Sequence, residues 1–199
     1  MEPILSGLVS VLSVLAILAV IHVPLGSLIH RVFTSPRHTR LEGGVYRLVG
    51  VDPGTEQRWT GYAVSVLALS AVSILVLWLL LVGQGLLPLS QGRSMNLDTA
   101  LNTAISFVTN TNWQSYAGEV GTGYLVQATG LTVQNFLSAG VGLAVAIAVV
   151  RGLARADSDR LGNFWVDLTR GTLRLLLPLL LLFLKQIQTL CCFLLLPAG

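Results

Sequence analysis

Four long apolar stretches limit the folds that this 199-residue chain can adopt. They cover approximately residues 4–23, 59–81, 124–150 and 173–196. A helix needs about 20 residues to cross the roughly 30 Å hydrocarbon core of a bilayer, and each stretch is long enough. Because lipid offers the backbone no hydrogen-bond partners, each stretch is expected to be helical. The sequence therefore predicts an all-α membrane protein with about four transmembrane helices.

The composition also argues against a soluble enzyme or a nucleic-acid-binding protein. Hydrophobic residues make up 53% of the chain and charged residues only 11%, whereas a soluble domain carries about 25% charged residues. The net charge is only +3, and most basic residues flank apolar stretches. The stretch at residues 4–23 could alternatively be a cleaved signal peptide. No basic residue precedes it and no A-x-A site follows it, so we expect a retained membrane helix.

The arginines are unevenly distributed between the connections, and this asymmetry predicts the orientation. The first connection carries Arg31, Arg37, Arg40, Arg47 and Arg58, and the third carries Arg151, Arg155, Arg160, Arg170 and Arg174. The long second connection has a single basic residue, Arg93. The positive-inside rule then places both arginine-rich connections in the cytoplasm and both termini outside. We interpret these arginines as purely topological signals rather than as ligand-binding groups.

The second connection, residues 83–123, contains a short segment with helical periodicity. Between Asn96 and Val108, apolar side chains recur at spacings of three and four residues. Asn96 is a suitable N-cap, and Asp98 lies near the positive end of the helix dipole. At about 1.5 Å per residue, this helix is too short to cross a bilayer. We expect a re-entrant helix that enters the membrane from outside, with an ordinary external loop and surface helix as the alternative.

An uncharged polar segment, T-N-T-N-W-Q at residues 109–114, follows this short helix. Irregular backbone at membrane depth is tolerated only where protein buries it or where it lines a water-filled path. The negative end of a re-entrant helix also points toward the centre of the bilayer. Carbonyl, hydroxyl and amide oxygens in such a place suit a cation that sheds its water. The absence of fixed charge favours a monovalent ion, because the ion must also leave.

The remaining polar groups point to a pore rather than to an enzyme. The third apolar stretch carries Gln127, Thr129, Thr132, Gln134 and Asn135, which are expected to face protein or a pore. The sequence has no paired acids, Ser/His pair or metal-ligating cluster at membrane depth, and no phosphate-binding P-loop. We therefore expect neither a catalytic site nor ATP hydrolysis in this chain.

The order helix, re-entrant helix, polar strand, helix is the membrane–pore–membrane repeat of potassium channels and their transporter relatives. The strings L-N-T-A-I-S-F-V-T-N-T-N-W-Q-S-Y at residues 101–116 and G-L-T-V-Q-N-F-L-S-A at residues 130–139 closely resemble the KdpA family. The string L-G-N-F-W-V-D-L-T-R at residues 161–170 is similar to the segment before that family's fourth helix. KdpA proteins are the potassium-binding and potassium-translocating subunits of the bacterial Kdp pump.

The resemblance implies a domain arrangement and a set of partners. Residues 1–58 match a leading membrane helix and cytoplasmic loop, residues 59–150 a first pore repeat, and residues 151–199 the opening of an incomplete second repeat. The family works in the bacterial inner membrane with KdpB, which hydrolyses ATP, and with KdpC and KdpF. The resemblance therefore implies that potassium is the transported ion, that ATP is used only by the partner, and that no nucleic acid is involved.

The resemblance also assigns the ion site. Thr109, Asn110, Thr111 and Asn112 match the family's first selectivity-filter strand, and Gln114 matches a glutamine close to the potassium ion. The strand lacks the glycine that is usual in potassium filters, where glycine permits a positive φ. Asparagine tolerates positive φ best among the other residues, so Asn110 and Asn112 are expected to take over this role.

The likeness to the family fades after about residue 184, and the chain ends before three further filter strands. We therefore expect a truncated or frameshifted product, or a fragment, of a potassium-pump subunit. Two alternatives stay open. One is a transport-inactive remnant, and the other is a stand-alone channel built from four copies.

Overall fold

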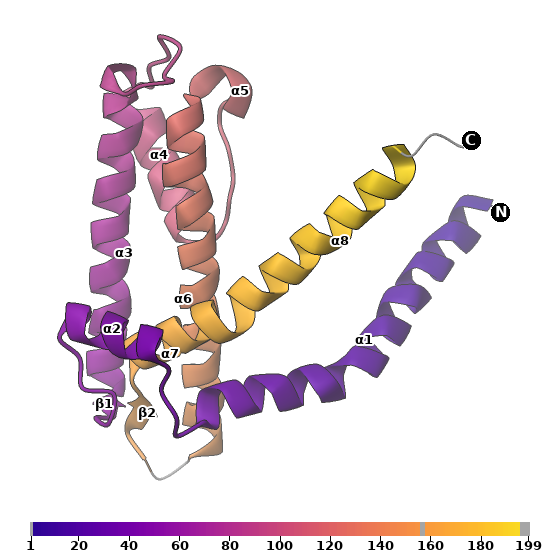
Figure 1. Cartoon of the computed structure of the whole chain (residues 1–199), viewed down its shortest axis with the longest axis vertical. Helices are drawn as coiled ribbons and strands as arrows, with labels where there is room; N and C mark the ends of the chain where they lie inside the picture. The colour runs from indigo at the N-terminus through magenta and orange to yellow at the C-terminus, as the bar shows by residue number, and fades with distance from the viewer. Residues whose placement is uncertain (1, 156–157, 196–199) are drawn as a thin grey trace. The chain divides into compact units, whose positions relative to one another are not determined.

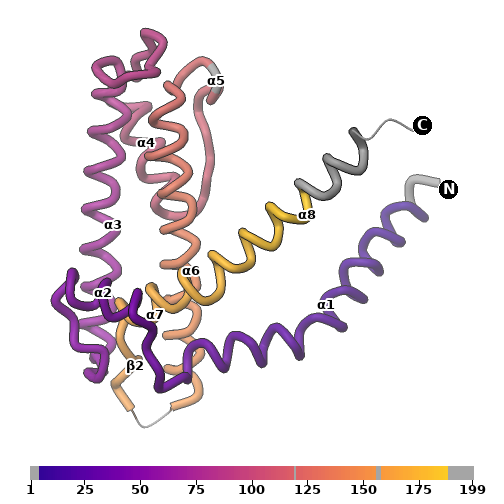
Figure 2. Tube along the Cα trace, viewed as in Figure 1, coloured from indigo at the N-terminus to yellow at the C-terminus, as the bar shows by residue number. Residues whose placement is uncertain are grey.

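The computed structural model describes residues 2–155 and 158–195, with the side chains of residues 2–4, 119 and 188–195 left aside. The chain divides into two compact units, Met1–His38 and Thr39–Gly199. These units do not coincide with the boundaries predicted near residues 58 and 150, which stay predictions. The first unit holds one helix, α1 (Glu2–Thr34), which is longer than expected because it continues through Pro24. Figure 2 shows a bend in α1, and a proline, which lacks the N–H that a helix interior needs, is a common cause of such a bend.

Three helices in the described part of the chain are long and apolar enough to cross a membrane, namely Leu5–Thr34, Trp59–Leu86 and Val126–Ala154. They confirm that the first three predicted stretches are helices long and apolar enough to span. The fourth stretch, residues 173–196, is helical through η3 (Gly171–Leu176) and α8 (Leu177–Leu195). Residue 196 and the last side chains of α8 lie outside the described residues, so a fourth span stays a prediction.

The second unit is organised around a hairpin of two long helices. These are α3 (Trp59–Val82), which η1 (Gly83–Leu86) extends, and α6 (Thr132–Ala154), which the π-helical turn η2 (Val126–Leu131) precedes. Between them, α4 (Leu97–Val108) turns back beside α3, and the following residues return to the end from which α4 began (Figure 1). A short helix, α5 (Gly118–Gly121), then leads into α6.

Two hydrophobic clusters fill this hairpin. The first joins α3, α4 and the start of α6 through Leu77, Leu81, Ala100, Ala104, Phe107, Val126 and Leu131. Ala100 and Ala104 are fully buried, so two small side chains let α4 approach its neighbours closely. The second cluster joins α3, α6 and α7 (Phe164–Arg170) through Tyr62, Ala144, Ala148, Phe164 and Leu168. The first cluster lies toward the end of the hairpin that carries α5, here called the α5 end. The second lies toward the opposite end, which carries α7 and is called the α7 end (Figure 1).

The two arginine-rich connections form an ordered layer, which the prediction of an all-α fold missed. Strands β1 (Gln57–Arg58) and β2 (Arg160–Gly162) pair antiparallel, with Gln57 opposite Gly162. Asn163 caps α7 and also donates its side-chain amide to the carbonyl of Thr55, at 3.1 Å. A third element, α2 (Arg40–Val49), begins with a capping box between Thr39 and Glu42 and packs near α7. Pairing between connections distant in sequence has no local signature, so periodicity could not reveal it.

Several arginines interpreted as purely topological make ion pairs, and that interpretation was wrong for them. Arg151 binds Asp167 through two hydrogen bonds, of 2.5 and 2.9 Å. Arg174 makes a bidentate ion pair with the fully buried Glu42. Two exposed pairs, Arg58–Asp159 at 2.6 Å and Arg155–Glu56 at 3.1 Å, link the two connections directly. These arginines therefore hold the α7 end together, whatever they also contribute to orientation.

The two buried carboxylates respond differently to their surroundings. Burial raises the pKa of Asp167 above its ordinary value, although the Arg151 guanidinium acts in the opposite direction. Burial also acts to raise the pKa of Glu42, but hydrogen bonds from Arg174 and from the Thr39 backbone outweigh burial and lower it.

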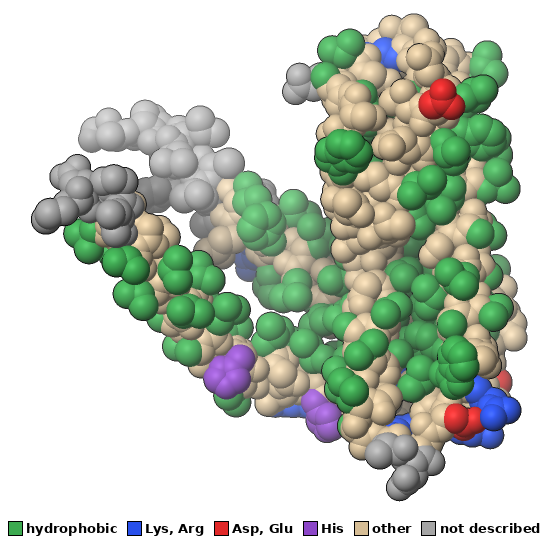
Figure 3. Space-filling view, turned by 180° about the vertical axis from the view of Figure 1, so that it is seen from behind, with side chains coloured by type: hydrophobic (Ala, Val, Ile, Leu, Met, Phe, Trp, Pro, Cys, Tyr) green, Lys and Arg blue, Asp and Glu red, His purple; other side chains and the backbone are tan. Residues whose placement is uncertain are grey.

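Figure 3 shows one face of the molecule, on which charged side chains gather mainly at the α7 end and hydrophobic side chains cover the middle. This distribution suits a protein whose middle lies in lipid.

Candidate functional site

The candidate site begins with the placement of α4. Asn96 occupies the N-cap position, as predicted, but its side chain makes no capping hydrogen bond, and Asp98 lies in the first turn. The indole N–H of Trp78 on α3 donates to the carbonyl of Leu97, at 3.2 Å. At the other end of α4, Phe107 is buried in the first cluster. The helix is thus held at both ends, and its C-terminus lies part-way along the hairpin (Figure 1).

The residues after α4 form a tight return strand, which we define as Thr109 to Gln114. Its backbone is hydrogen-bonded to one residue of α4. The carbonyl of Ser106 accepts the N–H groups of Thr111 at 3.0 Å and Asn112 at 3.2 Å. The next N–H group, that of Trp113, donates to the Ser106 hydroxyl oxygen at 2.6 Å. Three successive N–H groups of the return strand are therefore directed to a single serine.

Two residues of the return strand, Asn110 and Asn112, have a left-handed backbone conformation. Asn110 and Asn112 have positive φ angles of 59° and 54°, which is the conformation expected for the two asparagines. The carbonyl oxygens of Thr109, Asn110, Thr111 and Asn112 accept no hydrogen bond from the described part of the chain. A segment with its N–H groups satisfied and its carbonyls free is a good ligand for a cation.

The side chains of the strand add further oxygen atoms. The hydroxyl groups of Thr109 and Thr111 lie 3.0 Å apart, and Ser138 on α6 donates to Oδ1 of Asn110 at 3.2 Å. All five predicted site residues are exposed. Four of them, Thr109 to Asn112, lie together in the turn after α4. The fifth, Gln114, makes no side-chain hydrogen bond to the described residues. An open groove beside the strand is lined by Asn102, Ile105, Ser106, Thr109, Thr111 and Trp113.

Comparison with known proteins decides the family. The sequence matches the KdpA family, described as Potassium-transporting ATPase A subunit, over residues 12–186. The chain belongs to the KdpA family.

Three relatives named "Potassium-transporting ATPase potassium-binding subunit" illustrate the match. The protein from Kineococcus radiotolerans is 62% identical over 81% of this chain, and that from Mycobacterium sp. (strain KMS) is 56% identical over 90%. The protein from Streptomyces coelicolor is 53% identical over 90% of this chain. The aligned parts amount to 29%, 33% and 32% of these relatives, so this KdpA-family chain spans about a third of their length.

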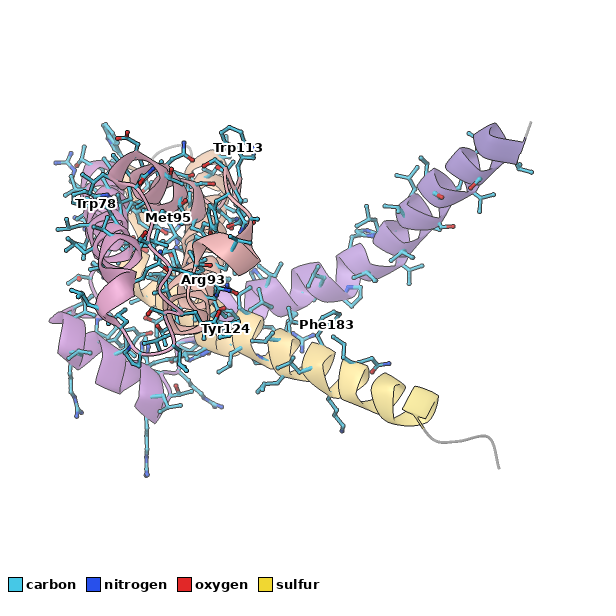
Figure 4. All side chains as sticks on the ribbon, turned by 90° about the horizontal axis from the view of Figure 1, so that it is seen from above. Trp78, Arg93, Met95, Trp113, Tyr124 and Phe183 are labelled. Carbon is cyan, nitrogen blue, oxygen red and sulfur yellow. The ribbon has the colours of Figure 1, made fainter. Side chains whose placement is uncertain are left out.

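The α5 end of the hairpin is built from residues whose roles the sequence did not reveal. Gln84 is fully buried, and its side chain donates to the carbonyl of Gly121 at 3.1 Å and accepts the N–H of Gly123 at 2.9 Å. Arg93 donates to the carbonyl of Thr122 at 2.9 Å and lies over the ring of Tyr124, 5.5 Å from its centre (Figure 4). The sole basic residue of this connection therefore has a structural role.

Gly123 is required for this arrangement because two backbone segments meet there. A Cβ atom at Gly123 would lie 2.8 Å from the Cα atom of Ser90, closer than Cβ atoms approach non-bonded atoms in proteins. Gln127, predicted to face protein or a pore, donates to the carbonyls of Gly118 and Thr122 at 2.9 and 3.1 Å. Together these contacts close the connection that carries the return strand.

The polar residues of α6 divide into two groups. Gln134 and Ser138 are buried, in agreement with the expectation that polar groups in this stretch face protein. Thr129 and Thr132 are exposed but bond to carbonyls of their own helical segment, at 2.8 Å each, and Asn135 is exposed. Ser138 and Ser106 were not among the predicted site residues. A serine on the buried face of a helix was the only signal that could have revealed them.

Proposed function

We propose that this chain supplies the first potassium-binding element of a potassium-translocating subunit in an ATP-driven uptake pump. One observation carries the proposal. The return strand presents carbonyl oxygens around Asn110 and Asn112 that accept no hydrogen bond from the described residues, at the C-terminal end of α4. Membership of the KdpA family and relatives named for potassium binding and potassium transport support the same conclusion.

The chemistry of the strand suits a monovalent cation. Potassium is held by replacing its hydration shell with neutral oxygen atoms, which bind the ion without trapping it. Thr109 to Gln114 contains no charged side chain, and the negative end of the α4 dipole adds a weak attraction. Gln114 completes the set with an amide oxygen that is free to turn toward the ion, since it makes no hydrogen bond to the described residues.

One strand supplies only about a quarter of the oxygen ring that a dehydrated potassium ion needs. The exposure of Thr109, Asn110, Thr111 and Asn112 fits a strand that completes its surroundings with further strands. In the proposal, the remaining strands come from the rest of a full-length subunit, of which residues 59–150 form the first pore repeat. Residues 1–58 form the leading helix and loop, and residues 151–199 open the second repeat.

The pump would act in the bacterial inner membrane, with both termini and the α5 end outside and α4 re-entering from that side. The arginines at the α7 end support this orientation through the positive-inside rule. KdpB would hydrolyse ATP, and KdpC and KdpF would complete the assembly. This chain then has no part in ATP chemistry, and potassium is its transported substrate.

A chimera tests the proposal. This chain replaces the matching part of the Kineococcus radiotolerans relative and is produced with the other subunits of that relative's pump in a strain that lacks its own potassium uptake systems. We expect growth on micromolar potassium and a potassium-stimulated ATPase in the purified complex. An assembled chimera without potassium stimulation contradicts the proposal. The 199-residue chain alone should not restore growth, and restoration would support a channel of four copies instead.

A further inference from the structure

The buried serine at the end of α4 bears directly on how the return strand is shaped. Ser106 is 7% exposed, and its neighbours Phe107 and Val108 are buried with it. A helix leaves its last carbonyl groups without partners, and here the Ser106 carbonyl is satisfied by two N–H groups of the strand that follows. The side chain of Ser106 makes a third hydrogen bond to the strand, because its hydroxyl oxygen accepts the N–H of Trp113 at 2.6 Å.

These contacts determine the direction of the strand's carbonyl groups. With the N–H groups of Thr111, Asn112 and Trp113 turned toward Ser106, the intervening carbonyl groups point elsewhere and stay free among the described residues. We propose that Ser106 is a positioning residue for the ion-binding strand and that its hydroxyl aligns the strand's carbonyl oxygens for selective potassium binding. This inference rests on the proposed function of Thr109 to Asn112.

The proposed effect comes from the side chain rather than from the backbone of Ser106. Any residue at this position supplies the carbonyl that holds Thr111 and Asn112. Only a residue with an acceptor close to its Cβ atom also holds Trp113. Without this third contact, the last part of the strand is free to rotate its peptide planes, and the spacing between oxygen atoms becomes variable. Potassium affinity and discrimination between potassium and rubidium should both weaken.

Three variants in the chimeric pump test this role. Ser106→Ala removes the acceptor, Ser106→Thr retains it, and Thr103→Val is the matched control. Thr103 lies on the same helix and is fully buried, but its hydroxyl donates to the carbonyl of Thr99 within α4 at 2.7 Å. The measurements are the potassium concentration for half-maximal ATPase stimulation and the ratio of this value to that for rubidium.

We expect Ser106→Ala to raise the half-stimulating potassium concentration about tenfold and to bring the rubidium ratio closer to one, with complex assembly retained. Ser106→Thr should stay within about threefold of the unsubstituted chimera, and Thr103→Val should match it. Amide hydrogen exchange of a peptide covering residues 109–116 should be faster in Ser106→Ala alone. If Ser106→Ala does not assemble, Ser106→Cys, which carries a poor acceptor of similar shape, replaces it.

An assembled Ser106→Ala or Ser106→Cys complex with unchanged potassium requirement, ion ratio and amide exchange overturns the inference. That result leaves the proposed function intact, because the unsubstituted chimera still responds to potassium. If the unsubstituted chimera itself shows no potassium stimulation, the proposed function fails and the positioning role fails with it. Equal losses in Ser106→Ala and Thr103→Val would show a general packing defect and also overturn the specific role of the hydroxyl.

Discussion

The hydroxyl of Ser138 on α6 donates to Oδ1 of Asn110 at 3.2 Å, and this bond connects the second long helix of the hairpin to the return strand. Ser138 is only 2% exposed, whereas the Asn110 residue is exposed and has a positive φ angle of 59°. A buried donor on a helix, whose single proton is shared with the Asn135 carbonyl at 3.1 Å, thus supports the side chain of a residue in a strained backbone conformation. The support comes from a residue 28 positions away in sequence.

Replacing Ser138 by alanine should therefore loosen Asn110. One neutral hydrogen bond contributes about 1 kcal/mol, so we expect Ser138→Ala to raise the half-stimulating potassium concentration of the chimera about fivefold. Ser70→Ala is the control, because the Ser70 hydroxyl bonds to the carbonyl of Val66 in its own helix, at 2.8 Å, and to no other described residue. Equal half-stimulating potassium concentrations for both variants in assembled complexes would show that the bond to Asn110 does not contribute to potassium binding.

The left-handed conformation of Asn110 and Asn112 predicts a sharp difference between two kinds of substitution. Glycine adopts a positive φ freely, whereas a β-branched residue there is strongly disfavoured, by about 1–2 kcal/mol or more. Asn112→Gly should keep the potassium requirement within about threefold, and Asn112→Val should raise it at least tenfold. ATPase titrations with potassium on purified chimeras measure both. A tolerated valine would mean that the left-handed geometry is not needed for ion binding.

Gln114 tests whether the ion path passes along the exposed side of the return strand. Two unit charges about 6 Å apart repel by about 3 kcal/mol at an effective dielectric constant of about 20, which corresponds to about a hundredfold in affinity. Gln114→Arg should raise the half-stimulating potassium concentration by about this factor. Gln91→Arg makes the same chemical change at an exposed position in a turn near the α5 end and should have little effect. An unchanged requirement in an intact Gln114→Arg complex would remove this residue from the ion path.

The buried pair of Glu42 and Arg174 predicts an acid-sensitive component of stability. Because the pKa of Glu42 is lowered in the folded chain, ionised Glu42 stabilises the fold above its unfolded pKa, and this contribution is lost as the pH falls through the folded pKa. Melting temperatures in detergent between about pH 7 and pH 3 should therefore fall more steeply for the parent chain than for Glu42→Gln.

Glu56→Gln is the control for this measurement. Its pair with Arg155 is exposed, with side-chain accessibilities of 44% and 45%, and such pairs contribute about 0–1 kcal/mol. The pH profile of Glu56→Gln should follow that of the parent chain. A Glu42→Gln profile that also follows the parent would show that the ion pair gives no net stabilisation.

The proposed orientation can be tested by cysteine labelling. Ser94 is exposed in the connection toward the α5 end, and a Cβ atom added at Gly44 on α2 would meet nothing within 4 Å, so a cysteine fits at either position. After Cys191 and Cys192 are replaced by serine, Ser94→Cys should react with an impermeant reagent on intact cells, and Gly44→Cys should react only after lysis. Labelling of Gly44→Cys alone on intact cells would reverse the orientation.

Local sequence patterns were sufficient for the main helices and for the short helix between them. Hydrophobicity and length predicted the helices at residues 59–81 and 124–150, and three- and four-residue spacing predicted α4, because such features depend on neighbouring residues in one segment. The absence of charge and of helical periodicity after Val108 likewise predicted an irregular polar strand. The tolerance of asparagine for positive φ is also a property of single residues, so the backbone conformation of Asn110 and Asn112 could be anticipated.

Only the tertiary structure decided which distant groups support these elements. Ser106 and Ser138 become supports of the return strand because the chain reverses after α4 and α6 lies beside it. Arg174 meets the buried Glu42, 132 residues away in sequence, because α2 packs near α7, and Arg151 meets the buried Asp167, 16 residues later, because α7 packs against α6. A hydrogen bond or an ion pair needs two groups within about 3 Å, and no local pattern encodes the partner of a group that only folding brings near.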